Sequence, residues 1–239
     1  MRKSDFTLPT LDDLFSTQAE RDDAKLERVR NIPLAELHPF KGHPFKVQNN
    51  EEMQRMIESI RKVGAITPAL ARPLPGGGYE LISSHRRLAA CKALGMDAMP
   101  VIVRDLTDEE AVITMVDSNL QREHILPSEK AFTYKMKMEA LSHQGKTSRQ
   151  VGERWSVSQI SEAGTDSERQ IHRYIRLTNL IPDILKLVDE GKIALTPAVE
   201  LSYLQPSEQE MLFSVMDSDE VTPSLSQARR LRRMSEAQT

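Results

Sequence analysis

Five consecutive polar residues lie at the point where a short apolar run changes into a helical pattern. The apolar run covers residues 79–82, and the helical spacing after it continues to Gly95. The polar residues at the predicted start of this helix are Ser83, Ser84, His85, Arg86 and Arg87. Free backbone N–H groups and the positive end of the helix dipole attract phosphate there, and arginines add charge-assisted hydrogen bonds. The pattern indicates a phosphate-binding turn; a solvated helix cap with two surface arginines is the alternative interpretation.

A second candidate site consists of two short helices separated by a glycine. Residues 156–159 have the form of a capping box, and the helix that they open ends at Gly164. Residues 165–168 form another capping box, which opens a helix that runs to about Thr178. Two helices across a glycine turn are typical of the helix-turn-helix motif, whose second helix enters the major groove of DNA.

The second helix of this pair is predicted to have a basic face. At about 100° per residue, its three arginines fall on the side opposite the apolar residues around Ile171. The candidates for contact with base edges are Ser167, Arg169, Gln170 and Arg173, and those for contact with the DNA backbone are Lys146, Arg149 and Arg176. A solvated helix face with ordinary i, i+4 charge spacing is the alternative interpretation.

Apolar spacing predicts the elements that position the phosphate-binding turn. Four apolar residues between Met53 and Ile60 mark a helix with one buried face, which stops at Gly64. A strand is predicted at residues 100–103, and a Thr-x-x-Glu capping box at residues 107–110 opens the next helix. These elements make a region of mixed strands and helices.

After residue 126, every predicted element is a helix. The first begins with Pro127 in its opening turn and is expected to join two domains. Further helices are predicted at residues 180–188, 193–204 and 207–215. A last helix within residues 222–239 has a basic patch that either contacts DNA or is solvated, made of Arg229, Arg230, Arg232 and Arg233.

Composition limits the possible functions of the 239-residue chain. Its apolar runs are too short to span a bilayer, and its first residues lack the apolar core of a signal peptide, which together predict a cytoplasmic protein with no membrane partner. The single cysteine, Cys91, excludes an internal disulfide and lies on an apolar helix face, so it is expected in the core. The formal net charge is −3, so nucleic-acid binding must depend on local basic clusters.

Several segments, in this order along the chain, resemble the sequence boxes of the ParB family of chromosome and plasmid partition proteins, in its mobile-element branch. They are a proline-rich basic box at residues 38–46, a Gly-x-x-x-Pro segment at 64–68, the His-Arg-Arg turn at 83–87, and an Asn-x-Gln-Arg segment within 117–124. The resemblance covers roughly residues 32–215. The order of the boxes is a stronger signal than any one of them.

In that family the boxes hold CTP, so the resemblance implies CTP and Mg²⁺ as cofactors. The residues that it implies for nucleotide binding are His43, Lys46, Thr67, Pro68, Ser84, His85, Arg86, Arg87, Asn119, Gln121 and Arg122, and for Mg²⁺ Asn119 and Glu123. Ser84 stands where the family has glycine, and it is alternatively a plain helix cap. Ser118 stands at the family's acid position, which leaves Asp117, Glu123 or water to supply the hard oxygen ligand.

The resemblance implies an α+β fold, with a small mixed-sheet, ParB/sulfiredoxin-like N-terminal domain followed by an all-α helix-turn-helix domain. The expected layout is a mobile leader at residues 1–31, a nucleotide-binding domain at 32–125, a DNA-binding domain at 126–221 and a basic tail at 222–239. No segment is a candidate for the C-terminal dimerisation domain that ParB proteins usually have.

The implied function is a CTP-gated DNA clamp. A homodimer would close around double-stranded DNA at a centromere-like site, hydrolyse CTP slowly to reset, and work with a Walker-type partition ATPase to segregate a plasmid, mobile element or chromosome. The alternative is a sequence-specific transcription regulator whose N-terminal domain no longer binds nucleotide. An enzyme like sulfiredoxin is disfavoured because Cys91 lies two helical turns from the phosphate turn, where that chemistry needs a thiolate.

Overall fold

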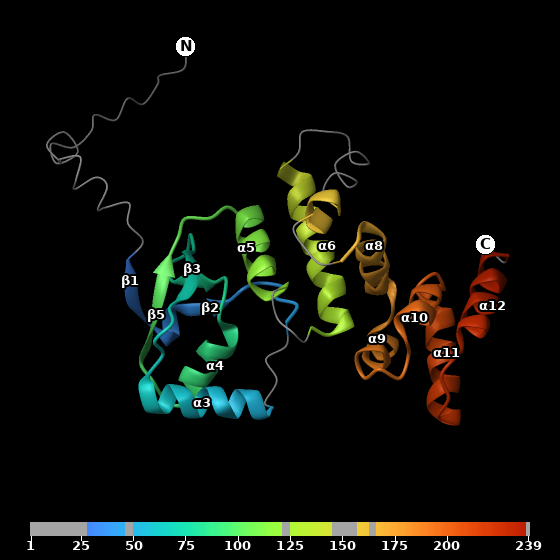
Figure 1. The fold of residues 1–239 in the computed structure, drawn as a ribbon, viewed down its shortest axis with the longest axis horizontal. Helices are drawn as coiled ribbons and strands as arrows, with labels where there is room; N and C mark the ends of the chain where they lie inside the picture. The colour runs from blue at the N-terminus through green and yellow to red at the C-terminus, as the bar shows by residue number, and fades with distance from the viewer. Residues whose placement is uncertain (1–27, 46–49, 121–124, 145–156, 163–165, 238–239) are drawn as a thin grey trace, which may run out of the picture.

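The computed structural model describes residues 28–45, 50–120, 125–144, 157–162 and 166–237. It contains a mixed sheet covered by helices, followed by an all-helical part that extends away from the sheet (Figure 1). The α+β fold class predicted from the sequence is therefore confirmed. Among the described residues, no helix combines the length and apolarity needed to span a membrane.

The sheet has five strands in the order β1-β5-β3-β4-β2. These strands are β1 (Val29–Pro33), β2 (Leu37–Pro39), β3 (Ala69–Pro73), β4 (Tyr79–Leu81) and β5 (Ala98–Val103). The β1–β5 and β3–β4 pairs are antiparallel, whereas β3–β5 and β2–β4 are parallel. Because β1 begins at Val29, the predicted start of the folded domain at residue 32 is wrong by three residues. Strand β1 pairs with β5 although its sequence, Val-Arg-Asn-Ile-Pro, is short and gives little apolar signal.

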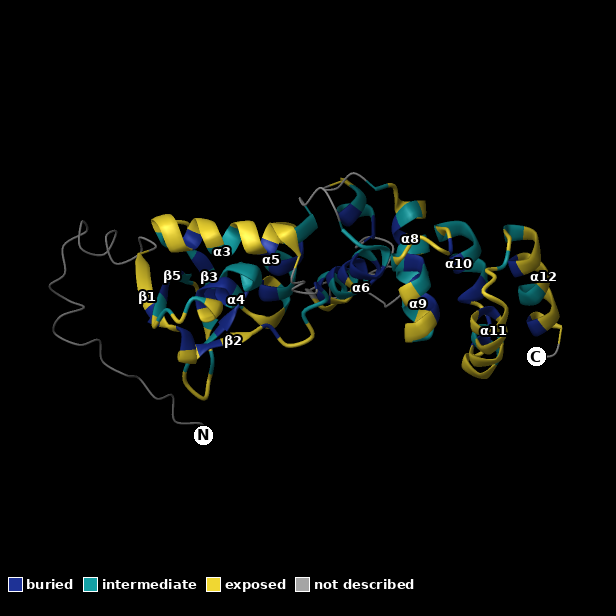
Figure 2. Ribbon diagram, turned by 90° about the horizontal axis from the view of Figure 1, so that it is seen from below, coloured by how far each residue is buried: buried dark blue, intermediate teal, exposed yellow. Residues whose placement is uncertain are grey.

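Helices cover both faces of the sheet. Helices α3 (Glu51–Val63) and α4 (His85–Ala93) pack on one face, where Cys91 is buried in the core as predicted. Successive strand residues point to opposite faces, so Leu70 of β3 packs instead with α5 (Asp108–Leu120). Figure 2 shows that the outer surface of α3 is exposed, as its amphipathic sequence predicts.

The second part of the chain consists of helices around another core. They are α6 (Pro127–Gln144), α8 (Glu168–Arg176), the 3-10 helix η2 (Leu177–Asn179), α9 (Pro182–Asp189), α10 (Leu195–Leu201), α11 (Pro206–Asp219) and α12 (Leu225–Glu236). The predicted tail at 222–239 is therefore wrong as a separate unit, because Ala228 of α12 is buried in the same core as Leu201 of α10.

Helix α6 packs against both parts of the molecule (Figure 1). Its Met136 packs with the α5 cluster around Met115, and its Tyr134 packs with Ile171 of α8. Lys137 of α6 forms an ion pair with Asp117 of α5. The helix expected to join the two domains therefore contributes side chains to the cores on both sides of it.

Candidate phosphate pocket and nucleic-acid interface

A cavity of about 470 Å³ lies at the N-terminus of α4. Its walls come from five separate segments, namely the loop after β2, helix α3, the loop before β3, the turn at the start of α4 and the end of α5. Most residues predicted to bind nucleotide line it, and these are His43, Thr67, Pro68, Ser84, His85, Arg86, Arg87 and Asn119. Lys46, Gln121 and Arg122 lie outside the described residues. The structure thus brings together residues that are up to 76 positions apart in the sequence.

Ser84 has the backbone conformation that favours glycine. Its φ and ψ are 71° and 32°, in the left-handed region, and it occupies the N-cap position of α4. Its hydroxyl makes no capping bond and instead accepts a hydrogen bond from Arg87 Nη1 at 2.9 Å, so the alternative of a simple side-chain cap is wrong. The turn therefore keeps the glycine-type backbone path, at the strain cost that a Cβ adds.

The two arginines of this turn have different partners. Arg86 Nη1 lies 3.1 Å from Glu52 Oε2 of α3, and the Glu52 side chain is 62% exposed. An ion pair with a solvent-exposed partner contributes little, so a phosphate can replace Glu52 at small cost. Arg87 is held by Ser84, and burial lowers the pKa of its guanidinium. Both cations border the cavity, where an anion would compensate their charge.

The loop after β2 is fixed over the start of α4 by two histidines. The backbone N–H of Phe40 donates to His85 Nε2 at 3.3 Å. The rings of His43 and His85 lie 3.7 Å apart between centroids. His43 Nδ1 donates to the Phe45 carbonyl at 2.8 Å, since a carbonyl oxygen can only accept. These contacts position the proline-rich segment as one wall of the cavity.

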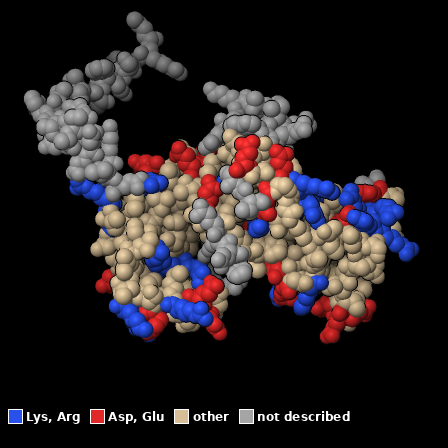
Figure 3. All heavy atoms as spheres, in the orientation of Figure 1, with Lys and Arg blue, Asp and Glu red and all other residues tan. Residues whose placement is uncertain are grey.

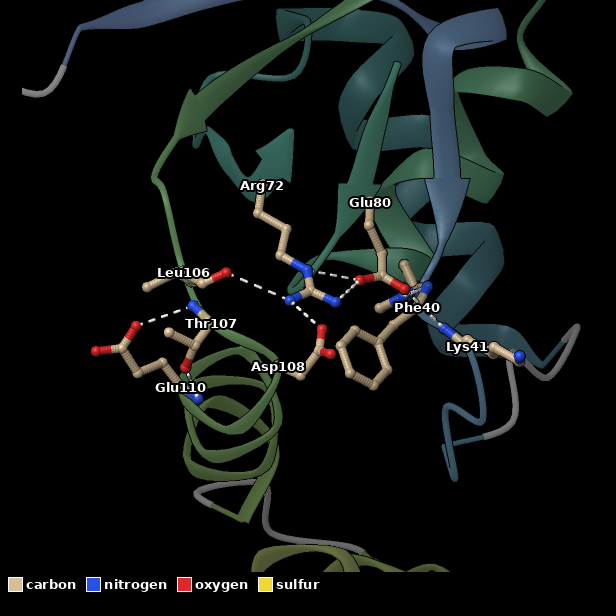
Figure 4. Close-up of polar contacts among 9 residues, drawn as sticks. Phe40, Lys41, Arg72, Glu80, Leu106, Thr107, Asp108 and Glu110 are labelled. Carbon is tan, nitrogen blue, oxygen red and sulfur yellow. Dashed lines mark hydrogen bonds and ion pairs between the residues drawn. The ribbon is translucent and has the colours of Figure 1, made fainter. Parts of the chain in front are cut away.

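A buried ion pair connects this loop to the sheet and to α5 (Figure 4). The side chain of Glu80 accepts from Arg72 Nε at 2.8 Å and from the backbone N–H of Lys41 at 3.1 Å. Arg72 Nη1 also lies 2.7 Å from Asp108 Oδ1 and donates to the Leu106 carbonyl at 3.3 Å. Sequence reasoning missed this network, although the charged Glu80 inside the apolar run at residues 79–82 was a signal for it.

The described lining of the cavity contains no carboxylate. Ser118 and Asn119 supply neutral oxygen groups, and the Asn119 amide donates to the Met115 carbonyl at 2.8 Å. Asp117, one alternative for the metal ligand, is paired with Lys137 of α6 and does not line the cavity. Glu123 lies outside the described residues, and it is the remaining acid in the Mg²⁺ prediction.

The second candidate site is built from α6, the helical residues 157–162 and α8. Val157 and Ile160 are buried against Ile171 and Tyr134, so the two predicted short helices pack together. Gly164 and the turn around it lie outside the described residues.

The start of α8 differs from the prediction. Ser167 is the N-cap, and its hydroxyl accepts from the Gln170 N–H, so the predicted cap at Thr165 is wrong. Asp166 is used in a tertiary contact instead, because its Oδ2 accepts from Tyr134 Oη at 2.6 Å and from Lys130 Nζ at 2.9 Å. Burial acts to raise the pKa of Asp166, but the two hydrogen bonds and the positive charge of Lys130 together outweigh it, and the pKa lies below its usual value.

The predicted outward face of α8 is correct for Arg169, which is exposed. Arg173 is half-buried, and its Nη2 donates to Thr196 Oγ1 of α10. Arg176 is not an outward residue, because its guanidinium stacks 3.9 Å from the centre of the Tyr203 ring and donates to the Ser202 carbonyl. Helical periodicity alone could not reveal the neighbouring helix that provides these partners. Lys146 and Arg149 lie outside the described residues.

One exposed residue on the same side of α8 was missed. His172 is three positions after Arg169, which places the two side chains next to each other on the helix surface. Gln170 is half-buried, and the Ser167 hydroxyl is occupied as a cap. The accessible basic and imidazole side chains of α8 are therefore Arg169, His172 and the half-buried Arg173, with the exposed Glu168 at the first position of the helix.

Comparison with known proteins identifies similar sequences along most of the chain. The family model described as the ParB N-terminal domain matches residues 18–120. The chromosome-partitioning protein Spo0J of Thermus thermophilus is 33% identical over 204 residues, which cover 85% of this chain and 70% of that protein. The nucleoid occlusion protein of Geobacillus thermodenitrificans is 36% identical over 108 residues, covering 45% of this chain and 38% of that protein.

A solved structure shares the fold. The C2221 form of a Pnob8-like ParB-N domain superposes with a TM-score of 0.51 at 14% sequence identity. The match covers 88% of this chain and 93% of that one. At this level of identity the likeness concerns the fold alone.

Proposed function

Since the chain belongs to the ParB family of chromosome-partitioning proteins, we propose that it is a CTP-gated clamp on double-stranded DNA. In this proposal, the cavity at α4 binds CTP with Mg²⁺, and α8 recognises a centromere-like site. Two protomers form the clamp, slow CTP hydrolysis resets it, and a Walker-type partition ATPase moves the DNA cargo. The cargo is a chromosome, plasmid or mobile element.

The conformation of Ser84 is the observation that supports nucleotide binding most directly. A serine with φ of 71° is strained, and such strain persists where the surrounding structure requires a particular backbone path. Here that path turns the first N–H groups of α4 toward a cavity with two arginines, which is the arrangement that binds phosphate. A volume of about 470 Å³ is in the usual range for a small-molecule site.

The proposed gating depends on how the pocket walls are connected. A ligand shifts a conformational equilibrium only if it contacts one state better than the other. A triphosphate that contacts Arg86, Arg87 and Asn119 together would favour a particular placement of α4 relative to the end of α5. Because α5 packs on α6 and α6 packs on α8, a change in α5 would reach the DNA-binding helices.

The metal would act on the same phosphates. Mg²⁺ normally keeps several waters and binds through one or two carboxylates together with substrate phosphates. Asn119 and Glu123 are the residues proposed to hold it, and the ion would neutralise phosphate charge. The role of this chain is then to orient the ion at the end of α5.

DNA recognition is proposed for the N-terminal half of α8. A recognition helix lies in the major groove with its first residues at base edges, and arginine makes bidentate contacts to guanine. Arg169 and Arg173 are the proposed base-reading residues, with His172 beside them. Thr196 would hold the Arg173 guanidinium in place, which reduces the entropy lost on binding.

A transcription regulator without nucleotide binding remains the second candidate. The absence of a carboxylate from the described cavity lining favours it, since Ser118 occupies the position of the family's acid. Titration with CTP separates the two functions, because only the clamp requires the nucleotide.

The test is calorimetric titration of the protein with CTP, ATP, GTP and UTP in the presence of Mg²⁺. We expect selective CTP binding. Arg86→Ala is expected to weaken it roughly 10- to 150-fold, the value of a charge-assisted hydrogen bond of about 1.5–3 kcal/mol. Arg61→Ala on the exposed face of α3 is the matched control and should bind as the wild type does. No binding at millimolar CTP would leave only the regulator.

A further inference from the structure

Basic residues of the helical part are concentrated on two helices. Between Asp166 and Ala237 the sequence has nine Lys or Arg against twelve Asp or Glu, and seven of the nine lie on α8 or α12. Figure 3 shows Lys and Arg side chains gathered over α8 and, farther along the same face, over α12. An acidic domain therefore has a basic surface along one side.

The arginines of α12 are only partly neutralised. Arg232 is paired with Glu200 at 3.1 Å and with Glu236 at 2.8 Å, and Arg229 lies 3.5 Å from Glu200. Arg230 and Arg233 are exposed, and neither forms an ion pair with any residue that the structure describes. Arg229 and Arg233 are four positions apart, a spacing at which like charges destabilise a helix. Binding of a polyanion would relieve this repulsion.

The basic surfaces of α8 and α12 meet at Tyr203. The guanidinium carbon of Arg176 lies 3.9 Å from the centre of the Tyr203 ring, and that of Arg232 lies 3.6 Å from it. The two guanidiniums can therefore be no farther apart than the sum of these distances. Helix α12 is fixed in this position by the burial of Ala228 and by the Ser235 hydroxyl, which donates to Glu208 Oε2 at 2.6 Å.

We infer that α12 is a second DNA-contacting element, whose Arg229, Arg230 and Arg233 neutralise backbone phosphates beside the site contacted by α8. The inference rests on the proposed DNA binding and extends it from one helix to a continuous surface. Contacts to phosphate supply affinity and register without reading sequence. Exposed arginines on the same face as α8 suit that role, because the DNA backbone continues past the bases that a recognition helix contacts.

The test measures the salt dependence of binding to a mixed-sequence DNA duplex. Each phosphate contact contributes about 0.9 to the slope of log K against log salt, so the triple variant Arg229→Gln, Arg230→Gln, Arg233→Gln should have a slope shallower by roughly 2 to 3. Between about 50 and 200 mM salt, the affinity of the wild type should then fall roughly 15- to 60-fold more than that of the variant.

Two controls separate local contacts from other effects. The triple variant Arg55→Gln, Arg61→Gln, Lys62→Gln removes the same charge from the exposed face of α3 and should keep the wild-type slope. Replacing the three α12 arginines by lysine keeps the charge and should also keep the slope. If the glutamine variant does not fold, Arg230→Gln alone should still lower the slope by about 0.9.

The outcomes distinguish this inference from the proposed function. A wild-type slope in the α12 glutamine variant would overturn the inference and leave an acidic protein as the partner of that surface. An equal change in the α3 variant would also overturn it, because the effect would then come from net charge. Failure of the wild type to bind any duplex at low salt would instead refute the proposed DNA binding.

Discussion

The strained turn at Ser84 predicts an unusual order of stability among substitutions. At an ordinary position, a protein with glycine has a free energy of unfolding lower by roughly 0.5–1 kcal/mol than the same protein with alanine, because glycine gives the unfolded chain more conformational freedom. At Ser84 the left-handed backbone costs any residue with a Cβ about 1–2 kcal/mol, and glycine avoids this cost. After subtraction of glycine's entropic cost of about 0.4–1 kcal/mol, Ser84→Gly should be more stable than Ser84→Ala by about 0.5–1 kcal/mol.

Ser83 provides a matched comparison. It is half-buried like Ser84, its φ is not positive, and its hydroxyl also accepts one hydrogen bond, from the Leu70 N–H at 3.2 Å. Both substitutions at each position lose one such bond, so the hydroxyl contribution cancels between glycine and alanine. At Ser84 the glycine variant should therefore be more stable than the alanine variant, and at Ser83 the alanine variant should be more stable than the glycine variant.

The assay is urea unfolding of the four variants, with the midpoint and slope of the transition compared. Equal stability of Ser84→Gly and Ser84→Ala, with the ordinary order at Ser83, would refute the assignment of strain to Ser84. A second readout follows from the Ser84–Arg87 bond, because Ser84→Gly releases a guanidinium that borders the cavity. CTP affinity should therefore rise in Ser84→Gly.

Three further predictions concern the contacts of Glu80 and Asp166 and the separation of DNA binding from CTP binding. Glu80→Ala leaves the Arg72 cation buried without its main partner, so it should lower the free energy of unfolding by roughly 3–5 kcal/mol in the same urea assay. The control Glu58→Ala removes an exposed ion-pair partner on α3 and should lower the free energy of unfolding by less than about 1 kcal/mol. For Asp166 the folded-state pKa lies below the unfolded value, so its carboxylate stabilises the fold above about pH 4 and this contribution is lost as pH falls through the folded-state value. The stability difference between wild type and Asp166→Asn should accordingly be largest near neutral pH and shrink in acid; a constant difference would contradict the sign of the shift. Arg173→Ala should weaken binding to the cognate DNA site and leave CTP affinity unchanged in parallel titrations, and equal loss of both would contradict separate sites.

Local sequence patterns were sufficient to predict most helices and the phosphate-binding turn. The turn at residues 79–95 was predictable because strand alternation, a polar segment and a terminal glycine follow each other directly. The helix at residues 51–63 was predictable from four apolar residues and Gly64. The family resemblance then gathered His43, Thr67 and Asn119 around one cavity, which no local pattern could have done.

The wrong or missing predictions involve contacts between distant residues. Thr165 had the correct form for a cap, but Asp166 is drawn inward by Tyr134 and Lys130, and the helix begins after it. The position of Arg176 depends on Tyr203, which belongs to a segment 27 residues later. Strand β1 was missed because its stability comes from pairing with β5 rather than from its own apolar content.

The ion pair between α5 and α6 makes the junction of the two domains resistant to salt. The side chain of Lys137 is 7% exposed, whereas that of Asp117 is 50% exposed. While α5 and α6 stay packed, the enclosed ammonium keeps this counter-charge, and loss of the partner inside the packed interface would cost several kcal/mol. Ions in solution screen such a pair weakly, but they screen the exposed arginines of α8 and α12 strongly. Rising ionic strength should therefore release nucleic acid while the two halves of the protein stay attached to each other.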